Sequence, residues 1–449
     1  MINSRRYKMG LQIGIGIGIG RGLVGANVNQ GWYGVEWLTT NTSPDVTRIA
    51  SSVSAMALHA SLPIQRKRVA ALKRDDGSIN YYLKPDDWSK KVDGTASNLT
   101  GVDGQVMVIN PAHYAQYVTA GNLRQVKWSE EQQTGFHFVD TSWTSAYEAA
   151  LNRTNLKLAS VVNTTADYRG GNNNAALDAV ANSLLGQPAT AISRTNFRTY
   201  ARNRGAGWQM YTYQAHKEMW WSFIIEFATR NSQKPINAAL TVDGYKQGGL
   251  GNGVTDAVSA EWSAFNSYNS FIPCGSSNSL GNSSGEVSKI IPDFGGVGVN
   301  RTFTVPRYRG IENPFGHIWK NCDGINIEIQ SVAAGGESRA WTSNDPATWN
   351  DSNYVGYANK GLVSRVTGYM SEAIFGDGGE FLPKVAAGGS STHFCDYFYT
   401  SIPATGEDLR TLLLGGTAGS IAGFGSTYSN YSPANVYANV GSRLCYIDQ

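Results

Sequence analysis

The chain has 449 residues, a length that predicts two or three domains. Hydrophobic residues make up 41% and aromatic residues 11%, which is enough for large cores, whereas only 16% of residues are charged and 51 are glycine. The formal net charge of +3 argues against a nucleic-acid-binding or polyanion-binding protein, and the abundance of small polar residues is typical of strand-rich and loop-rich proteins of the extracellular or virion type.

Residues 1–30 contain a strict alternation of isoleucine and glycine from Ile13 to Gly20, after three basic residues. This alternation is a poor helical segment for a signal peptide, and no small-residue cleavage site follows it at Arg21-Gly22. No stretch of the sequence is long enough for a membrane span. We expect an extended arm whose isoleucines share one face, and that face must be buried against a neighbouring subunit or a docking partner.

Residues 31–130 are predicted to form a small β-rich domain. A turn at Asp75-Asp76-Gly77 separates apolar runs, and the Ile79–Leu83 run is typical of a strand. The basic run Arg66–Arg68 is interpreted as a solvated strand edge rather than a nucleic-acid patch. No chemistry is evident here, and we expect attachment or oligomerisation.

Residues 131–449 are predicted to form a larger domain with two helices. One spans Ser193–Gly205, and the other lies within Met210–Asn231, where aromatic and aliphatic residues recur at helical spacing. His216 lies on the apolar stripe of the second helix and is expected to be a structural core histidine. The Gly-rich region that follows is expected to be poor in strands up to one buried strand with Trp319 as a core anchor. Tyr-rich runs further on, including the one that holds Tyr397 and Tyr399, are expected to supply short strands of a sheet packed beneath loops. The fold class is α+β, with many short strands and loops.

The last segment, residues 415–447, differs in texture from the rest. Gly, Ser, Asn and Tyr supply 18 of its 33 residues, and its only charge is Arg443. It has neither helical spacing nor clean alternation of apolar residues, and Val440–Ile447 is predicted to form a strand that closes it. Tyrosines among small polar residues are typical of antibody binding loops, in which Tyr gives rigid contact area and Ser, Gly and Asn give adaptable hydrogen bonds. The alternative is a surface loop whose tyrosines pack underneath it.

Several short motifs do not support a catalytic or metal site. Gly20–Gly25 matches a dinucleotide-binding pattern and Gly281–Gly285 a nucleophile elbow, but neither has the required strand and helix beside it. The six histidines show no metal-binding spacing, and no calcium-binding sugar motif is present. We therefore expect no cofactor, no metal and no enzymatic activity.

The four cysteines, at positions 274, 322, 395 and 445, form no CxxC pair. They are interpreted either as free thiols or, for Cys395 and Cys445 beside the last segment, as a possible disulfide. The sequence leaves both alternatives open.

The end of the chain resembles the variable region of target proteins of diversity-generating retroelements, which carry a C-type-lectin-type fold. The similar elements are Leu409-Arg410, Gly415-Gly416, the Asn/Ser/Tyr segment and the closing Gly441–Leu444. The block from Arg307 to Ile327 also resembles this family as found in phages and prophages of gut Bacteroidales. The resemblance covers most of residues 131–447 and implies a C-type-lectin-like ligand-binding domain in which residues 415–447 vary.

In that family a reverse transcriptase substitutes adenines of Asn codons, which yields a limited set of residue types. The positions that belong to this set are the candidate ligand-binding residues Thr417, Ile421, Ser426, Tyr428, Asn430, Tyr431, Asn435, Tyr437 and Asn439. The tyrosines are expected to be anchors, and the Ser and Asn side chains to adapt hydrogen bonds. Gly415, Gly416, Gly441 and Arg443 are expected to be scaffold.

The resemblance implies a receptor-binding adhesin at a phage tail tip or fibre end, forming a homotrimer. Its partners would be a protein or glycan of the bacterial surface and, through the N-terminal part, other tail components, with no nucleic acid. One alternative is a host-encoded bacterial surface adhesin of the same fold. Another is an oxidase like the formylglycine-generating enzymes, but these use two closely spaced cysteines, whereas Cys395 and Cys445 are fifty residues apart.

Overall fold

The computed structural model describes residues 31–296 and 298–448. The predicted Ile/Gly arm, residues 1–30, lies outside the described residues. Gly31–Gln449 form one compact unit, which is mixed in class and richer in strands than in helices. Among the described residues the strands belong to eight sheets, of which the four largest have seven, six, five and four strands.

Two sheets are built mainly from the first third of the chain. The five-stranded sheet has the order β2 (Thr47–Ala50), β1 (Tyr33–Leu38), β8 (Leu123–Ser129), β7 (His113–Ala120) and β9 (His137–Val139). The seven-stranded sheet has the order β13 (Trp208–Met210), β31 (Leu444–Ile447), β10 (Ser142–Ser145), β6 (Gln105–Asn110), β3 (Ala70–Lys73), β4 (Ile79–Lys84) and β5 (Asp87–Lys91).

The later chain forms a six-stranded and a four-stranded sheet. The six-stranded sheet has the order β23 (Gly368–Tyr369), β26 (Tyr397–Tyr399), β29 (Thr427–Tyr428), β28 (Leu413–Leu414), β19 (Trp319–Asn321) and β30 (Val440–Gly441). The four-stranded sheet has the order β22 (Ala358–Leu362), β21 (Ser338–Thr342), β20 (Ile325–Gln330) and β27 (Glu407–Arg410).

Four smaller sheets complete the strands. They are β16 (Gly285–Ile291) with β17 (Arg301–Tyr308) and β18 (Ile311–Glu312), β11 (Ala150–Asn152) with β12 (Lys157–Ala159), β14 (Ile236–Asn237) with β15 (Gln247–Gly248), and β24 (Glu372–Ile374) with β25 (Leu382–Val385). The 3-10 turns are η1 (Ser54–Ala57), η2 (Ala166–Tyr168), η3 (Ala175–Leu177), η4 (Asn278–Leu280) and η5 (Val332–Ala334).

Both predicted helices form, but the expected number of two is too low. The helices are α1 (Leu58–Ser61), α2 (Pro63–Arg66), α3 (Arg194–Arg202), α4 (Tyr213–Phe227) and α5 (Ser259–Asn266). Ser193 caps α3 and Thr212 caps α4, each by accepting a hydrogen bond from a backbone N–H three residues later. α5 has only eight residues between Gly-rich segments, too few for its spacing to stand out in the sequence.

The predicted domain boundary after residue 130 does not separate compact units. In the seven-stranded sheet β6 pairs with β10, and β10 pairs with β31 near the C-terminus. The two predicted domains therefore share one sheet and one core. A boundary inferred from a change in composition could not anticipate this, because the pairing of β6 with β10 across it leaves no signal in composition.

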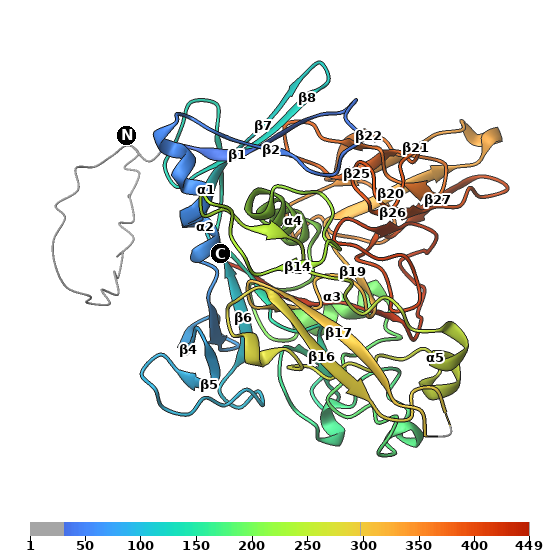
Figure 1. Cartoon of the computed structure of the whole chain (residues 1–449). Helices are drawn as coiled ribbons and strands as arrows, with labels where there is room; N and C mark the ends of the chain where they lie inside the picture. The colour runs from blue at the N-terminus through green and yellow to red at the C-terminus, as the bar shows by residue number, and fades with distance from the viewer. Residues whose placement is uncertain (1–30, 297, 449) are drawn as a thin grey trace, which may run out of the picture. The chain divides into compact units, whose positions relative to one another are not determined.

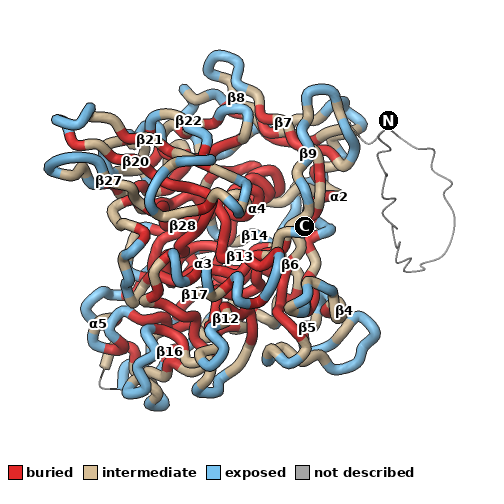
Figure 2. The backbone as a smooth tube through the Cα atoms, turned by 180° about the vertical axis from the view of Figure 1, so that it is seen from behind, coloured by how far each residue is buried: buried red, intermediate tan, exposed pale blue. Residues whose placement is uncertain are grey.

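α4 lies in the middle of the unit, near β14 (Figure 1). Every residue of α4 except Gln214 is buried, so the helix is covered on all sides rather than along one stripe. Buried backbone is concentrated around it, and exposed backbone lies in the outer loops (Figure 2). His216 is fully buried and hydrogen-bonded at both ring nitrogens, which confirms the prediction of a structural histidine.

Three local predictions are wrong. The region after residue 250 is not strand-poor, because β16 and β17 pair over seven residues. Trp319 is buried as predicted, but it belongs to β19, and the run that follows it forms β20 in a different sheet. The basic run Arg66–Arg68 does not lie on a strand edge. It begins at Arg66, the last residue of α2, and it ends at Arg68, which is only 3% exposed.

Candidate functional site

The C-terminal segment, residues 415–447, contributes short strands to two different sheets. β29 and β30 lie in the six-stranded sheet, and β31 lies in the seven-stranded sheet. The predicted closing strand is thus split into β30 and β31. The segment is tied to the rest of the unit at both ends and in the middle.

Backbone hydrogen bonds from outside the segment fix its path. Several distant amide groups donate to its carbonyl oxygens, among them Thr411 to Tyr431 (2.9 Å), Arg194 to Pro433 (3.0 Å), Ala191 to Tyr437 (3.0 Å) and Trp319 to Asn439 (2.9 Å). Backbone bonds of this kind do not depend on which side chain a position carries. The segment can therefore change side chains while it keeps its path.

Gly415, Gly416 and Arg443, which were expected to be scaffold, are fixed by backbone geometry, close packing or buried hydrogen bonds. Gly415 and Gly416 have φ values of 88° and 84°, a region that favours glycine. A Cβ on Gly416 would lie 2.3 Å from the Cβ of Ala422. Arg443 is fully buried, and its guanidinium donates to the carbonyl oxygens of Glu312 and Asn313. These residues hold the segment from beneath.

Six tyrosines form a continuous line of ring contacts, which we name the tyrosine row. Its members, in order of contact, are Tyr369, Tyr397, Tyr399, Tyr428, Tyr431 and Tyr437. Successive ring centroids lie 4.8, 4.6, 5.5, 4.6 and 4.2 Å apart. These are distances of direct aromatic packing. The row starts on β23 and β26, crosses β29 and ends in the loop before β30.

A small apolar cluster supports the row. Trp319, Leu413 and Val440 are buried together, and three tyrosines of the row pack against them. The Trp319 ring lies 5.5 Å from that of Tyr428 and 6.2 Å from that of Tyr399. The tyrosines themselves are half-buried, and Tyr437 at the end of the row is 39% exposed. The row is therefore a rigid aromatic surface that is fixed on one side and open on the other.

The hydroxyl groups of Tyr431 and Tyr399 in the row stay protonated at neutral pH. Burial raises the pKa of Tyr431, and the neighbouring Tyr428 and Tyr437 raise it further. Burial and the nearby Tyr397 also raise the pKa of Tyr399. Protonated phenols both donate and accept hydrogen bonds. The row thus offers neutral, bifunctional polar groups along an aromatic surface.

Of the nine predicted site residues, seven are at least partly exposed and two are buried. Tyr428, Asn430, Tyr431, Asn435 and Asn439 are half-buried, and Ile421 and Tyr437 are exposed. Thr417 and Ser426 are buried, which corrects the expectation that they contact a ligand.

Ser426 and Thr417 are buried because they hold the loop together. The Ser426 hydroxyl accepts a hydrogen bond from the backbone N–H of Tyr397 at 3.0 Å. The Thr417 hydroxyl lies 3.1 Å from that of Ser420. A small polar residue in a loop-rich segment looks the same in the sequence whether it supports the loop or faces outward.

Asn435 and Asn430 differ in whether their side-chain oxygens accept hydrogen bonds within the protein. The Asn435 carbonyl oxygen accepts from both the backbone N–H and the hydroxyl of Ser432, at 2.8 and 2.9 Å, so it closes a local turn. The Asn430 side-chain oxygen has no hydrogen-bond partner among the described residues. This oxygen is itself buried, so it does not face solvent in this arrangement of the loop.

Half of the tyrosine row lies outside the predicted segment. Tyr369, Tyr397 and Tyr399 precede residue 415, and sequence reasoning treated their strands as packing beneath loops. The signal was the Tyr-Phe-Tyr run of β26, in which Phe398 is buried and its two neighbours point to the other face. Alternation over three residues is too short to be recognised without the partner strands.

The cysteines do not form the pair that an oxidase of the formylglycine-generating type needs. All four are free and buried, so the possible disulfide between Cys395 and Cys445 is not formed. Burial and the nearby Asp396 raise the pKa of Cys395 to about 12, which disfavours the reactive thiolate. Within residues 31–296 and 298–448, no cluster of three or more His, Cys, Asp or Glu residues could hold a metal ion.

In the part of the chain that the structure describes, no helix combines the length and the apolar character needed to cross a membrane.

Comparisons with known proteins give little guidance. No protein-family model and no curated protein match the chain. Among solved structures, the Major Tropism Determinant U1 variant has 11% identity and a TM-score of 0.23, over 78% of this chain and 73% of that chain. The M1 variant has 11% identity and a TM-score of 0.20, over 85% and 81%. Likenesses this weak do not establish a common fold, so the function must be inferred from the chain's own geometry.

Proposed function

We propose that this protein is a receptor-binding adhesin whose tyrosine row contacts a ligand on the bacterial cell surface. The observation that carries the proposal is the row itself: six tyrosines in unbroken contact, three of them packed on a buried cluster and all six at least partly exposed. An aromatic surface of this kind typically provides the anchors of a protein interface.

The composition of the row suits recognition that can be retargeted. Tyrosine supplies a large contact area at low entropic cost, because only two side-chain torsions are fixed on binding. The small polar residues between the tyrosines supply hydrogen bonds that adjust to the partner. The backbone bonds to Pro433, Tyr437 and Asn439 remain available for other side chains. These features support a segment that is diversified, as the resemblance to retroelement target proteins implies.

The finer parts of the proposal concern the particle and its assembly. We place the protein at a phage tail tip or fibre end, as a homotrimer joined to other tail components through its N-terminal part. Several modest sites on one particle gain roughly 10²–10⁴-fold in avidity. A surface that must tolerate substitution can therefore still hold a cell firmly.

Binding to intact bacterial cells tests the proposal. The purified protein is compared with a Tyr428→Ala, Tyr431→Ala, Tyr437→Ala triple variant across a panel of candidate host strains. The matched control is Tyr268→Ala, because Tyr268 has the same 39% exposure as Tyr437 but lies outside the row. Melting curves establish that each variant is folded.

We expect the triple variant to melt near the wild-type temperature and to lose cell binding, while the control keeps it. Equal binding by the triple variant and the wild type would overturn the proposal, since the row would then be a packing surface only. A triple variant that unfolds would also count against it, because an open surface should contribute little to stability.

A further inference from the structure

A second candidate site lies away from the tyrosine row, in a cavity of about 740 Å³. It opens between the start of α4, the loop around β9, and two later segments, residues 342–360 and 377–380. No tyrosine of the row lines it, and the C-terminal segment contributes only Ile447. Its volume is within the range of small-molecule sites, about 300–1,000 Å³.

The floor of the cavity carries buried polar groups with unused hydrogen-bonding capacity. Glu218, His113 and Arg68 line it, and each is at most 5% exposed. Apart from the 3.4 Å contact between the Oε2 atom of Glu218 and the Nε2 atom of His113, these two atoms and the Nε atom of Arg68 have no hydrogen-bond partner among the described residues. Buried groups of this kind each cost about 1–3 kcal/mol unless something satisfies them.

These groups are held in fixed orientations. The His113 ring packs on Trp128, with centroids 4.1 Å apart, and its Nδ1–H donates to the Pro111 carbonyl at 3.0 Å. The Nε2 atom is thereby directed towards Glu218, 3.4 Å from its Oε2 atom. Gln214 donates to the other oxygen of Glu218 at 2.8 Å. The site is built before any ligand arrives.

Glu218 is an ionised hydrogen-bond acceptor. Burial by itself would raise its pKa, but His113, Lys217 and His137 outweigh burial and hold the pKa below its ordinary value. Arg68 supplies a donor on the same floor, and its Nη1 donates to Asn110 at 2.7 Å. Glu218 as acceptor and Arg68 as donor together suit a ligand group that can both donate and accept a hydrogen bond.

The two lysines of the cavity already have partners. Lys217 donates to the Gly378 carbonyl at 2.7 Å, and Lys360 lies 3.2 Å from Glu380. Tyr213 donates to the other oxygen of Glu380 at 2.6 Å. Five carboxylates but only three Lys or Arg side chains line the cavity, so it has no surplus of positive charge for an anion. The carboxylate of a zwitterion would therefore find no free lysine ammonium group in the cavity.

Aromatic rings complete the walls. Trp349 lines the cavity, held by a hydrogen bond from its Nε1 to the Ser343 carbonyl at 2.9 Å. Phe138 lies on the rim and is 55% exposed, although it is a large apolar side chain. Aromatic surfaces beside carboxylate, amide and guanidinium groups suit a molecule with apolar faces and a hydroxyl-bearing edge.

We infer that this cavity binds a short neutral saccharide. Sugar hydroxyls both donate and accept, so they satisfy Glu218 and Arg68 together, and the C–H faces of the ring pack on Trp349 and Phe138. This inference goes beyond the proposed adhesin function. The cavity draws almost nothing from residues 415–447, so its sugar would stay the same when the tyrosine row changes its partner.

Titration of the purified full chain with neutral disaccharides tests the inference. The probes are maltose, cellobiose, lactose and chitobiose, followed by tryptophan fluorescence and by saturation-transfer NMR. Glu218→Gln keeps the shape of the floor but removes its charge, and Phe138→Ala truncates the exposed rim without disturbing the core. Tyr268→Ala is the control. Glycine, glutamate and inorganic phosphate are titrated in parallel as a zwitterion, an acidic amino acid and an anion.

We expect at least one disaccharide to bind saturably, and Glu218→Gln to weaken its affinity about tenfold or more, as expected for a lost bond to a charged group. Phe138→Ala is expected to weaken it as well, and the control to leave it unchanged. Absence of saturable disaccharide binding would overturn the inference. So would preferential binding of glycine, glutamate or phosphate, or disaccharide binding that both cavity variants retain in full.

Discussion

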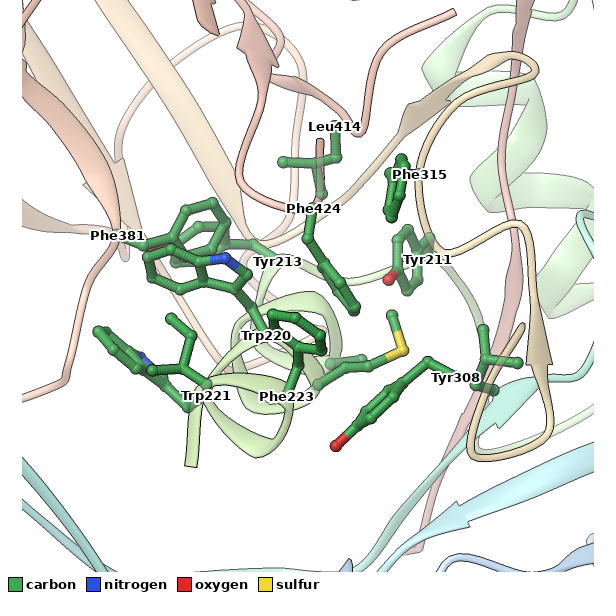
Figure 3. Packing of buried hydrophobic residues seen from close by; sticks show 14 of the residues in the cluster. Tyr211, Tyr213, Trp220, Trp221, Phe223, Tyr308, Phe315, Phe381, Leu414 and Phe424 are labelled. Carbon is green, nitrogen blue, oxygen red and sulfur yellow. The ribbon is translucent and has the colours of Figure 1, made fainter. Parts of the chain in front are cut away.

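Two regions of this molecule are rich in aromatic residues and use them in opposite ways. α4 carries Trp220, Trp221 and Phe223 and is buried on every side, with Phe424 of the C-terminal segment packed against it (Figure 3). The tyrosine row is packed on one side only. Residue type therefore does not distinguish a core from a binding surface here. The difference is whether other side chains cover both faces of the aromatic ring or only one.

The polar atoms of the two regions show the same contrast. In the core, Trp221 donates to the Gly379 carbonyl at 2.6 Å and Tyr213 to Glu380 at 2.6 Å, so their polar groups are satisfied internally. In the row, the pKa of Tyr431 is raised by burial and by the adjacent tyrosines, so its phenol stays protonated beside two others. These two core groups bond to other buried groups, although the Nε1 of Trp220 has no hydrogen-bond partner among the described residues, whereas the row keeps its phenols at a partly exposed surface.

The largest predicted effect is on the core. Trp220→Ala removes a fully buried indole that contacts Trp221, Phe381 and Phe394. We expect the free energy of unfolding to fall by about 3–5 kcal/mol, because a large cavity replaces the ring. Urea unfolding measures this loss. Trp220→Phe is the matched control and should lose clearly less; equal losses from both variants would contradict the cavity account.

The next effect concerns acid stability through His216. Its Nε2–H donates to the Phe424 carbonyl at 2.7 Å, and its Nδ1 accepts from the Tyr211 hydroxyl at 2.9 Å. Burial, with Lys320 and Arg443 nearby, lowers its pKa to about 3. The neutral ring therefore contributes stability that is fully present above about pH 6.5 and is lost as the pH falls towards the folded-state pKa.

We expect this histidine to account for up to about 3 kcal/mol of stability lost between about pH 7 and pH 4. Urea midpoints of the wild type and of His216→Gln at both pH values measure it. The variant removes this titration but leaves His59 and the carboxylates in place. The stability gap between the two proteins should narrow in acid, and a gap that stays constant with pH would show that His216 does not titrate in this way.

Sequence patterns predicted the elements that depend on neighbours in the chain. α3 and α4 were found because caps and helical spacing lie within a few residues, and His216 was placed in the core because it shares that spacing. The split between β30 and β31 and the shared seven-stranded sheet were missed. Both depend on which distant strand pairs with which, and that choice leaves no local signal.

The candidate site was predicted in part for the same reason. Tyr428, Tyr431 and Tyr437 stood out as tyrosines in a polar loop, whereas Tyr397 and Tyr399 looked like ordinary strand residues. Only the parallel pairing of β26 with β29 brings the two sets together. Ser426 was assigned to the surface because burial of a small polar residue depends on a partner, here the amide of Tyr397, that the sequence does not identify.

A single substitution in the middle of the row sharpens the contrast with α4. Tyr431 contacts tyrosines on both sides, at 4.6 and 4.2 Å, and lies over the Trp319 cluster. We expect Tyr431→Ala to weaken cell binding by about 2 kcal/mol per site, or about thirtyfold, as for a central interface anchor. Its stability should fall far less than that of Trp220→Ala. A loss of stability as large as in the core variant would place Tyr431 in the core instead.

The smallest effect is expected at the end of the row. Tyr437 stacks on Tyr431 at 4.2 Å with an angle of 23° between the rings, but it is 39% exposed and has only this one ring neighbour. Tyr437→Ala should weaken cell binding by about 1 kcal/mol, because residues near the rim of an interface contribute less than central ones.

Tyr437→Phe separates the two parts of the side chain, since it keeps the stacked ring and removes the hydroxyl. If the row binds mainly through aromatic area, the Phe variant retains most of the affinity, and binding curves on cells should place it near the wild type. If the Phe and Ala variants are equally weak, the hydroxyl makes the contact, and the row acts as an array of hydrogen-bonding groups rather than as an apolar surface.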